Sequence, residues 1–403
     1  MSRFIDLSIY RRNRNFAFLF TGQFISFAGT MITSVALPFQ VYHETRSTLM
    51  VGLLSLVQLI PILFTALLGG VFADRYHRRV LLFTAESVLA VGCLLLAWNA
   101  TLTTPYIWLI FCVAALMSAF NGLHRPALES IVQQIVDEKD FGTVGSLSTF
   151  KYSISMIGGP ALGGLLIATH GIAITYFVDM MTFLFSLFCL FMMSHIPKPD
   201  RTHDDTTLQS LKAGVRYAMS RQELIGTYVV DFIAMIFGMP SALFPAIAHS
   251  YGGVKVLGLL YAAPAVGALV ISFYGNWTRF RRHGLAISIA AVLWGLSIIA
   301  FGLVSNLYAA LFFLAAAGAF DGISGIYRSV MWNQTIPNHL RGRLAGIEMI
   351  SYLSGPKLGD TEAGLVAAAF GITASIVSGG ALCVAGVGIC CLFLPKFIQY
   401  RAK

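Results

Sequence analysis

Charged side chains interrupt stretches of this sequence that are otherwise apolar, and they are the residues best suited to chemistry. The carboxylates that stand out are Asp231, Asp321 and Glu348, and the cations are Arg125, Lys151 and Arg328. A charge at the centre of a membrane-spanning helix costs about 2.5 to 3.5 kcal/mol on insertion scales unless it is paired or hydrated. Charged residues that are present despite this cost indicate a function, because a carboxylate can carry a proton and a cation can attract an anion.

The composition indicates that membrane helices must position these side chains. Of the 403 residues, 57% are hydrophobic and only 11% are charged, and the mean hydropathy is +0.76. Soluble domains carry about 25% charged residues. Repeated apolar stretches of about twenty residues match the hydrocarbon core of a bilayer, which is about 30 Å thick. We therefore expect an all-α membrane protein with twelve transmembrane helices.

The predicted spans fall into two sets of six that are joined by one long polar stretch. They are 16–42, 48–73, 80–99, 105–123, 143–168 and 172–195, then 224–247, 254–276, 284–303, 307–330, 344–369 and 372–395. This pattern predicts an N-terminal six-helix bundle at 1–196, a cytoplasmic linker at 197–222 and a C-terminal six-helix bundle at 223–403.

Lysine and arginine are distributed unevenly between the two sets of loops. One set carries the N-terminal arginines, basic clusters within 75–79, 279–282 and 341–343, the linker and the basic C-terminal residues. The other set carries only Arg46 and Lys255. Because positively charged loops stay in the cytoplasm, we predict that both termini are cytoplasmic. The net charge of +9 then reflects orientation in a membrane and gives no reason to expect nucleic-acid binding.

Short pieces of the first half recur in the second half at a constant offset. Ala119-Phe120-Asn121-Gly122-Leu123 returns as Ala319-Phe320-Asp321-Gly322-Ile323, and Gln134 and Gly142 return as Gln334 and Gly342. These matches predict two related halves, an architecture in which the substrate site lies between repeats near the middle of the membrane.

The loop after the second predicted span reads Gly69-Gly70-Val71-Phe72-Ala73-Asp74-Arg75-Tyr76-His77-Arg78-Arg79. It resembles the G-x-L-A-D-R-x-G-R-[RK] loop of the major facilitator superfamily, with His77 at the position of the second glycine. The resemblance implies a gating loop formed by Gly70, Asp74, Arg75, Arg78 and Arg79. In that family the aspartate faces a helix end of the other half, where such a contact adds about 1 kcal/mol and can bias two nearly balanced states.

The fifth predicted span contains a second motif, Ser155-Met156-Ile157-Gly158-Gly159-Pro160-Ala161-Leu162-Gly163-Gly164. It resembles the G-x-x-x-G-P-x-x-G-G motif of antiporters in the same superfamily, and the matching positions are Ser155, Gly159, Pro160, Gly163 and Gly164. Small residues allow helices to approach closely, and a proline bends a helix. The resemblance implies antiport, and hence export; a packing face with no bearing on direction is the structural alternative.

Three further stretches, 335–343, 355–364 and 231–245, resemble the enterobactin exporter branch of siderophore and drug efflux proteins. In the superfamily the first, fourth, seventh and tenth helices line the cavity. The resemblance therefore implies that Gln23, Asn121, Asp231 and Asp321 line it here. The full set of substrate-cavity candidates is Gln23, Asn121, Arg125, Lys151 and Arg328, and the proton-coupling candidates are Asp231, Asp321 and Glu348.

Motifs for other kinds of chemistry are absent from the sequence. There is no GxxxxGK[ST] phosphate loop, no HExxH and no GxSxG. The six cysteines form no CxxC pair, and none of them has a histidine at metal-binding spacing. We expect no enzyme activity, no catalytic residues, no metal and no cofactor, so the energy must come from an ion gradient or from the gradient of the substrate itself.

Together these features predict a secondary-active exporter of a small organic molecule that works by alternating access and proton antiport in the bacterial inner membrane. The cations favour an anionic substrate, because charge attraction is stronger where the dielectric constant is low, and the branch resemblance suggests a siderophore. The expected partners are this substrate, protons and the lipid bilayer, and the expected state is a monomer. A multidrug or macrolide exporter is the alternative transporter, with an aromatic, weakly charged cavity. A non-transporting receptor or assembly factor is the alternative of another class.

Overall fold

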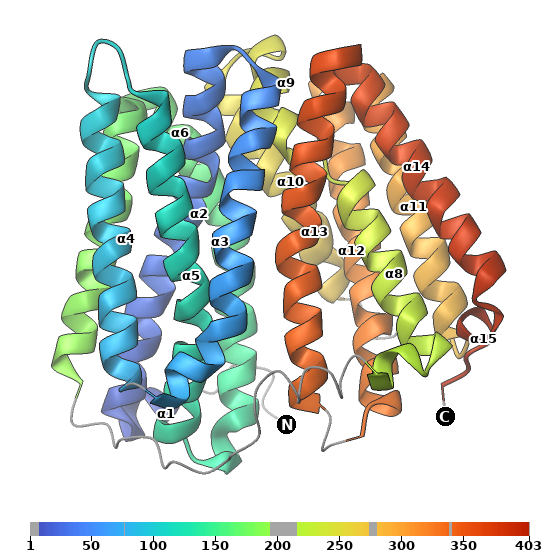
Figure 1. Cartoon of the computed structure of the whole chain (residues 1–403), viewed down its shortest axis with the longest axis horizontal. Helices are drawn as coiled ribbons and strands as arrows, with labels where there is room; N and C mark the ends of the chain where they lie inside the picture. The colour runs from blue at the N-terminus through green and yellow to red at the C-terminus, as the bar shows by residue number, and fades with distance from the viewer. Residues whose placement is uncertain (1–7, 76, 194–215, 274–279, 338–340, 403) are drawn as a thin grey trace. The chain divides into compact units, whose positions relative to one another are not determined.

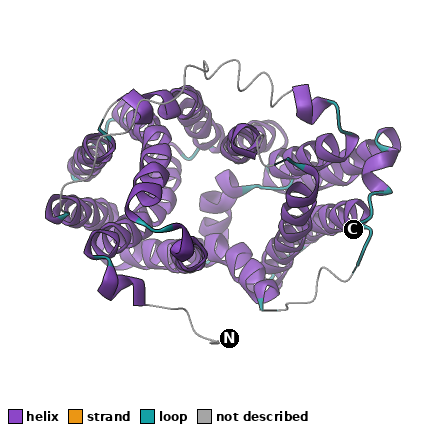
Figure 2. Ribbon diagram, turned by 90° about the horizontal axis from the view of Figure 1, so that it is seen from below, coloured by secondary structure: helices purple, strands orange, loops and turns teal. Residues whose placement is uncertain are grey.

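A computed structural model describes residues 8–75, 77–193, 216–273, 280–337 and 341–402 of the chain, and the side chains of 8, 67–75, 341–343 and 345–349 lie outside this description. Within the described residues every regular element is a helix (Figure 2). The chain divides into two compact units, Met1–Glu44 with Val57–His203, and Thr45–Leu56 with Asp204–Lys403. The predicted linker lies mostly outside the described residues, and the bundle boundaries at 196 and 223 stay a prediction.

The N-terminal helices are α1 (Ser8–Arg12), α2 (Arg14–Thr45), α3 (Thr48–Arg75), α4 (Arg78–Ala100), α5 (Ile107–Ile135), the 3-10 turn η1 (Glu138–Asp140) and α6 (Phe141–Met192) (Figure 1). Helix α4 packs against α5 and α6. A buried apolar cluster joins α2, α4, α5 and the end of α6, and it includes Leu19, Leu82, Ile131 and Leu190. This core fixes the helices that carry the polar groups of the first unit.

The C-terminal helices are α8 (Gln222–Phe237), η2 (Ser241–Leu243), α9 (Phe244–Ser250), α10 (Val254–Ser272), α11 (His283–Leu303), α12 (Leu307–Thr335), α13 (Arg341–Phe370), α14 (Ile372–Phe393) and α15 (Pro395–Ile398). Helix α12 packs against α10 and α11, and α8 packs against α11, α13 and α14. The sequence Gly238-Met239-Pro240 separates α8 from η2, because proline has no backbone N–H to continue the helix. Asp231 therefore lies in the last two turns of a short, broken helix.

The helix lengths are compatible with the twelve predicted membrane crossings. Ten segments of the described residues are long and apolar enough to span a bilayer. One of them contains α6, whose 52 residues would extend for about 78 Å at 1.5 Å per residue, more than twice the hydrocarbon thickness. Helix α6 is therefore long enough for two spans, and the 30 residues of α13, which is not among the ten segments, are long enough for one more. The prediction of an all-α, multi-pass membrane protein is confirmed.

Glycines with positive φ make the turns that end the fifth and eleventh spans. Gly171 has φ 82° and ψ 173°, and Gly371 has φ 92° and ψ 160°. Neither site is crowded, since a Cβ at either glycine would meet nothing within 4 Å. The left-handed backbone alone explains the glycine. The two positions are related by the offset of the sequence repeat, so the halves share this turn as well.

Large apolar side chains cover much of the outer surface, as a lipid environment requires. Leu392 and Phe393 of α14 are 81% and 77% exposed, and Phe312 of α12 is 66% exposed. Soluble proteins rarely leave so many large apolar groups in water. Small residues make the contacts between helices instead: a Cβ at Gly318 of α12 would overlap the backbone of Pro264 in α10.

Candidate functional site

A cavity of about 400 Å³ in the second unit brings together residues of α8, α12 and α13. It is lined by Tyr228, Asp231, Met235, Asp321, Gly325, Arg328, Ser329, Trp332, Asn333, Ile336, Leu344 and Tyr352. The spacing explains why these residues meet. Positions three, four or seven apart share one face of a helix, so α12 presents Asp321, Arg328 and Trp332 toward the same side.

One arginine lies between two carboxylates in this cavity. The Nη1 atom of Arg328 forms an ion pair with Asp231, and its Nη2 atom lies 3.5 Å from Oδ1 of Asp321. The side chains of Arg328 and Asp231 are 10% and 15% exposed, whereas that of Asp321 is 35% exposed. With all three ionised, the cluster carries one net negative charge. One added proton makes it neutral.

An aromatic pair forms another part of the cavity wall. The rings of Tyr228 in α8 and Trp332 in α12 stack with centroids 5.4 Å apart and planes inclined by 28°. Trp332 is fixed further by its Nε1, which donates a hydrogen bond of 2.9 Å to Oγ1 of Thr227. A fixed, flat apolar surface beside charged groups suits a ligand with conjugated rings and polar substituents.

The structure therefore brings three sequence-predicted residues into one cluster: Asp231, Asp321 and Arg328. The stacked aromatic pair was not predicted. Its members lie on different helices, and the sequence gives no sign of which helices face each other. The side chain of Glu348, the third proton-coupling candidate, lies outside the described residues.

The other cavity candidates lie in the first unit. Arg125 is 56% exposed and pairs with Glu129 one turn away, at 3.1 Å. The Nζ atom of Lys151 lies 5.9 Å from the ring centroid of Phe20 and 5.8 Å from that of Phe27, at the outer range of a cation–π contact.

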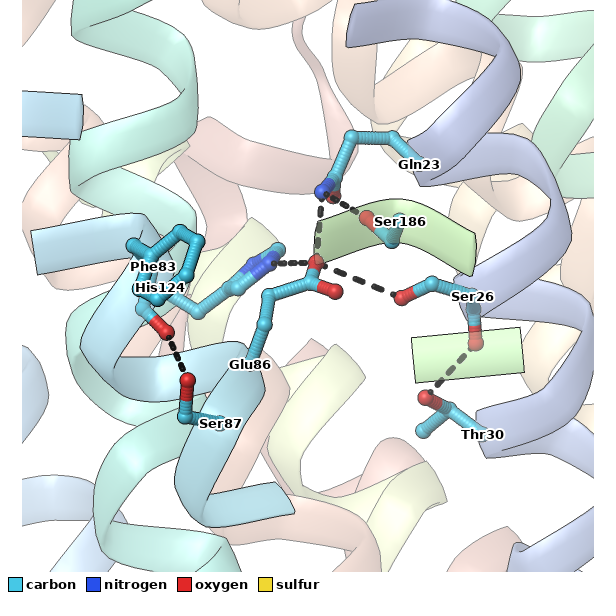
Figure 3. A network of polar contacts seen from close by, with 8 residues as sticks. All are labelled: Gln23, Ser26, Thr30, Phe83, Glu86, Ser87, His124 and Ser186. Atoms are coloured by element: carbon cyan, nitrogen blue, oxygen red, sulfur yellow. Dashed lines mark hydrogen bonds and ion pairs between the residues drawn. The ribbon is translucent and has the colours of Figure 1, made fainter. Parts of the chain in front are cut away.

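The two amides among the candidates differ in their surroundings. Gln23 is buried on α2 and donates a hydrogen bond of 2.6 Å to Glu86 (Figure 3). Asn121 is half-buried on α5. Gln23 thus belongs to a polar network inside the first unit.

Only part of the predicted gating loop has described side chains. Those of Gly70, Asp74 and Arg75 lie outside the described residues. Arg78 donates to the carbonyl of Ser130 at 3.2 Å, and Arg79 donates to the carbonyl of Phe191 at 2.9 Å. These two arginines tie the start of α4 to α5 and α6.

The antiporter-like motif packs α6 tightly against α2. A Cβ at Gly159 would overlap the side chain of Met31, and a Cβ at Gly163 would lie 3.1 Å from the carbonyl oxygen of Ile32. Ser155, Pro160 and Gly164 of the motif are buried as well. The motif therefore needs small residues for helix packing; this contact does not test the direction of transport.

Comparisons with known proteins agree with this architecture. Residues 9–400 match the family described as transmembrane secretion effector. The chain is 26% identical over 400 residues to the enterobactin exporter EntS of Citrobacter koseri, with 98% of this chain and 96% of the relative covered. It is 26% identical over 401 residues to EntS of Shigella boydii, with the same coverage.

Solved structures of transporters share the fold at low sequence identity. The nucleoside transporter NupG aligns with a TM-score of 0.77 at 12% identity, covering 94% of this chain and 99% of that one. A bacterial homologue of the human lysosomal transporter Spinster aligns with a TM-score of 0.74 at 15% identity, covering 97% and 98%. The family match and the full-length relatives identify a membrane transporter of the major facilitator type, and these relatives are transporters rather than enzymes. The chain belongs to the transmembrane secretion effector family of the major facilitator superfamily.

Proposed function

We propose that this transporter exports a siderophore or a similar small organic molecule across the bacterial inner membrane, by alternating access and in exchange for protons. The observation that carries the proposal is the cluster of Asp231, Arg328 and Asp321 beside a stacked aromatic pair in one cavity. The full-length similarity to enterobactin exporters supports the choice of substrate class. We further propose that both termini lie in the cytoplasm, as the lysine and arginine distribution predicts, and that the transporter is a monomer.

The cluster explains how a proton and a substrate would compete. An ionised carboxylate accepts hydrogen bonds from a ligand, and a protonated one accepts them less well. Proton binding at the cluster therefore weakens ligand binding, and ligand binding favours proton loss. This reciprocal relation between two ligands is what antiport needs.

Asp321 is the better candidate for the proton carrier. It is the more exposed carboxylate, and its contact with Arg328 is the longer one. A group that exchanges protons needs access to water, whereas the tighter partner, Asp231, holds the guanidinium in place. Glu348 stays a candidate on sequence grounds.

The predicted cations offer an anionic substrate less uncompensated positive charge than the sequence suggests. Arg328 and Arg125 are both paired with carboxylates, which offset their charge. Of the predicted cations, Lys151 contacts aromatic rings instead. The cavity in the second unit thus fits a ligand with conjugated rings and hydrogen-bond donors better than a highly charged anion.

A deletion strain grown under iron limitation tests the substrate class. We expect less siderophore in the medium and more inside the cells, restored by the wild-type gene on a plasmid. A plasmid that carries the Trp332→Ala variant should restore secretion only weakly, because the substitution removes the stacked aromatic surface. Unchanged secretion together with new sensitivity to hydrophobic drugs would overturn the siderophore proposal and favour the multidrug alternative.

A further inference from the structure

A second polar network lies inside the first unit, where residues of α2, α4, α5 and α6 meet around one carboxylate (Figure 3). Glu86 of α4 is fully buried, with a side-chain exposure of 0%. Gln23 and Ser26 of α2, His124 of α5 and Ser186 of α6 complete the network. None of these residues lines the cavity of the second unit.

The contacts of Glu86 involve one of its two carboxylate oxygens. Its Oε1 atom accepts hydrogen bonds from Nε2 of Gln23 at 2.6 Å and Oγ of Ser26 at 3.4 Å, and lies 3.1 Å from Nε2 of His124. Its Oε2 atom is buried and has no hydrogen-bond partner among the described residues. A buried ionised carboxylate needs a compensating charge as well as hydrogen bonds. In the described part of the chain, His124 is the ionisable group that pairs with it.

In the part of the chain that the structure describes, the other titratable groups that interact with Glu86 do not supply positive charge. Asp179 of α6 is also fully buried and interacts electrostatically with Glu86. It is held by the hydroxyls of Thr33 and Thr182 and by the thiol of Cys93. Cys189 of α6 interacts electrostatically with Glu86 too, and a thiol likewise carries no positive charge. Compensation of the Glu86 charge therefore depends on the protonation of His124.

We propose that Glu86 and His124 form a proton-binding pair in the first unit, separate from the carboxylate cluster of the second unit. In the deprotonated state, neutral His124 carries hydrogen on Nε2 and the pair has one net negative charge. Uptake of one proton at Nδ1 makes the imidazolium, and the pair becomes neutral. The proton enters through His124, whose side chain is 16% exposed while that of Glu86 is 0% exposed.

This inference goes beyond the proposed function, because it gives the transporter a second group that changes charge with pH. The network ties α2, α4, α5 and α6 to one carboxylate, so the protonation state of the pair acts on all four helices. Gln23, proposed on sequence grounds to line the substrate cavity, is on this basis a positioning residue for Glu86.

Proton counting on the purified full-length protein in lipid nanodiscs tests the pair without any substrate. An indicator dye in unbuffered solution reports how many protons the protein takes up when the pH is lowered from about 8 to about 5, a range that spans the ordinary titration of histidine. We expect Glu86→Gln to take up one proton fewer than wild type, because His124 then has no anion to stabilise its charged form. Adding His124→Gln to Glu86→Gln should change nothing further.

A matched control is available in the exposed pair of His43 and Glu44. Their side chains lie 3.2 Å apart but are 51% and 26% exposed, so water rather than the partner stabilises the charge. Glu44→Gln should leave the proton count unchanged. If Glu86→Gln alone does not yield folded protein, the double variant Glu86→Gln/His124→Gln, which leaves neither member of the pair, serves with the same expected loss of one proton. An unchanged count in either folded variant overturns the proposal, and a failure of transport by itself leaves this count unaffected.

Discussion

The two carboxylates beside Arg328 should differ in what they contribute to stability. Breaking a buried ion pair by removing one partner costs about 3 to 5 kcal/mol, whereas an exposed pair contributes about 1 kcal/mol or less. Asp231 is 15% exposed and in close contact with Arg328, while Asp321 is 35% exposed and 3.5 Å away. We expect Asp231→Asn to lower the free energy of unfolding by about 2 to 3 kcal/mol, because Asp321 still compensates part of the charge. Asp321→Asn should cost about 1 kcal/mol or less.

The double variant Asp231→Asn/Asp321→Asn leaves Arg328 without either carboxylate partner. With both carboxylates replaced, Arg328 is left as an uncompensated, mostly buried charge, so the loss should exceed the sum of the single losses. The assay is thermal unfolding of the purified protein in nanodiscs, followed by tryptophan fluorescence. Glu129→Gln, which breaks the exposed pair with Arg125, is the matched control and should shift the unfolding temperature little. Equal losses for the two single variants, or a strictly additive double variant, would refute the assignment of Asp231 as the anchor.

Three more changes have clear expected outcomes. Gly159→Ala should destabilise the protein by about 1 to 3 kcal/mol in the same unfolding assay, because its Cβ overlaps Met31, whereas Gly158→Ala, with nothing within 4 Å of its Cβ, should not. Asp74→Asn should slow transport while leaving the amount of protein in the membrane unchanged, as immunoblots of membrane fractions would reveal; wild-type transport rates would contradict a gating role. A reporter that is active only in the periplasm, fused after Lys403, should be silent, and an active fusion would reverse the proposed orientation.

The helices could be predicted from the sequence because the backbone hydrogen bonds of each span form within that span. A membrane helix makes its backbone hydrogen bonds within itself, so an apolar stretch of the right length is sufficient information. The boundary between the fifth and sixth spans was visible for the same reason, even though α6 is continuous apart from Gly171. Turn residues were harder to predict, since their conformation depends on which neighbour the helix must reach.

The candidate site was only partly predictable, because it depends on contacts between helices. Asp321 and Arg328 lie two turns apart on one helix, so their shared face follows from spacing alone. The contact of Arg328 with Asp231 on α8 does not, and neither does the convergence of Glu86 and His124. A charged residue inside a span indicates that it has a partner, but the sequence does not identify that partner. That is why the sequence overstated the positive charge available to a substrate.

Transport by the purified protein in liposomes tests the central claim, proton-driven export, most directly. The lumen is made acidic relative to the bath, and enterobactin, the substrate named for the relatives, is added outside. Antiport predicts that the compound accumulates in the acidic lumen, that a protonophore stops this accumulation, and that protein-free liposomes do not accumulate it. Asp321→Asn should abolish gradient-driven uptake and keep exchange with preloaded compound. Accumulation that persists without the pH gradient, or that Asp321→Asn leaves at the wild-type rate, would contradict proton coupling through this cluster.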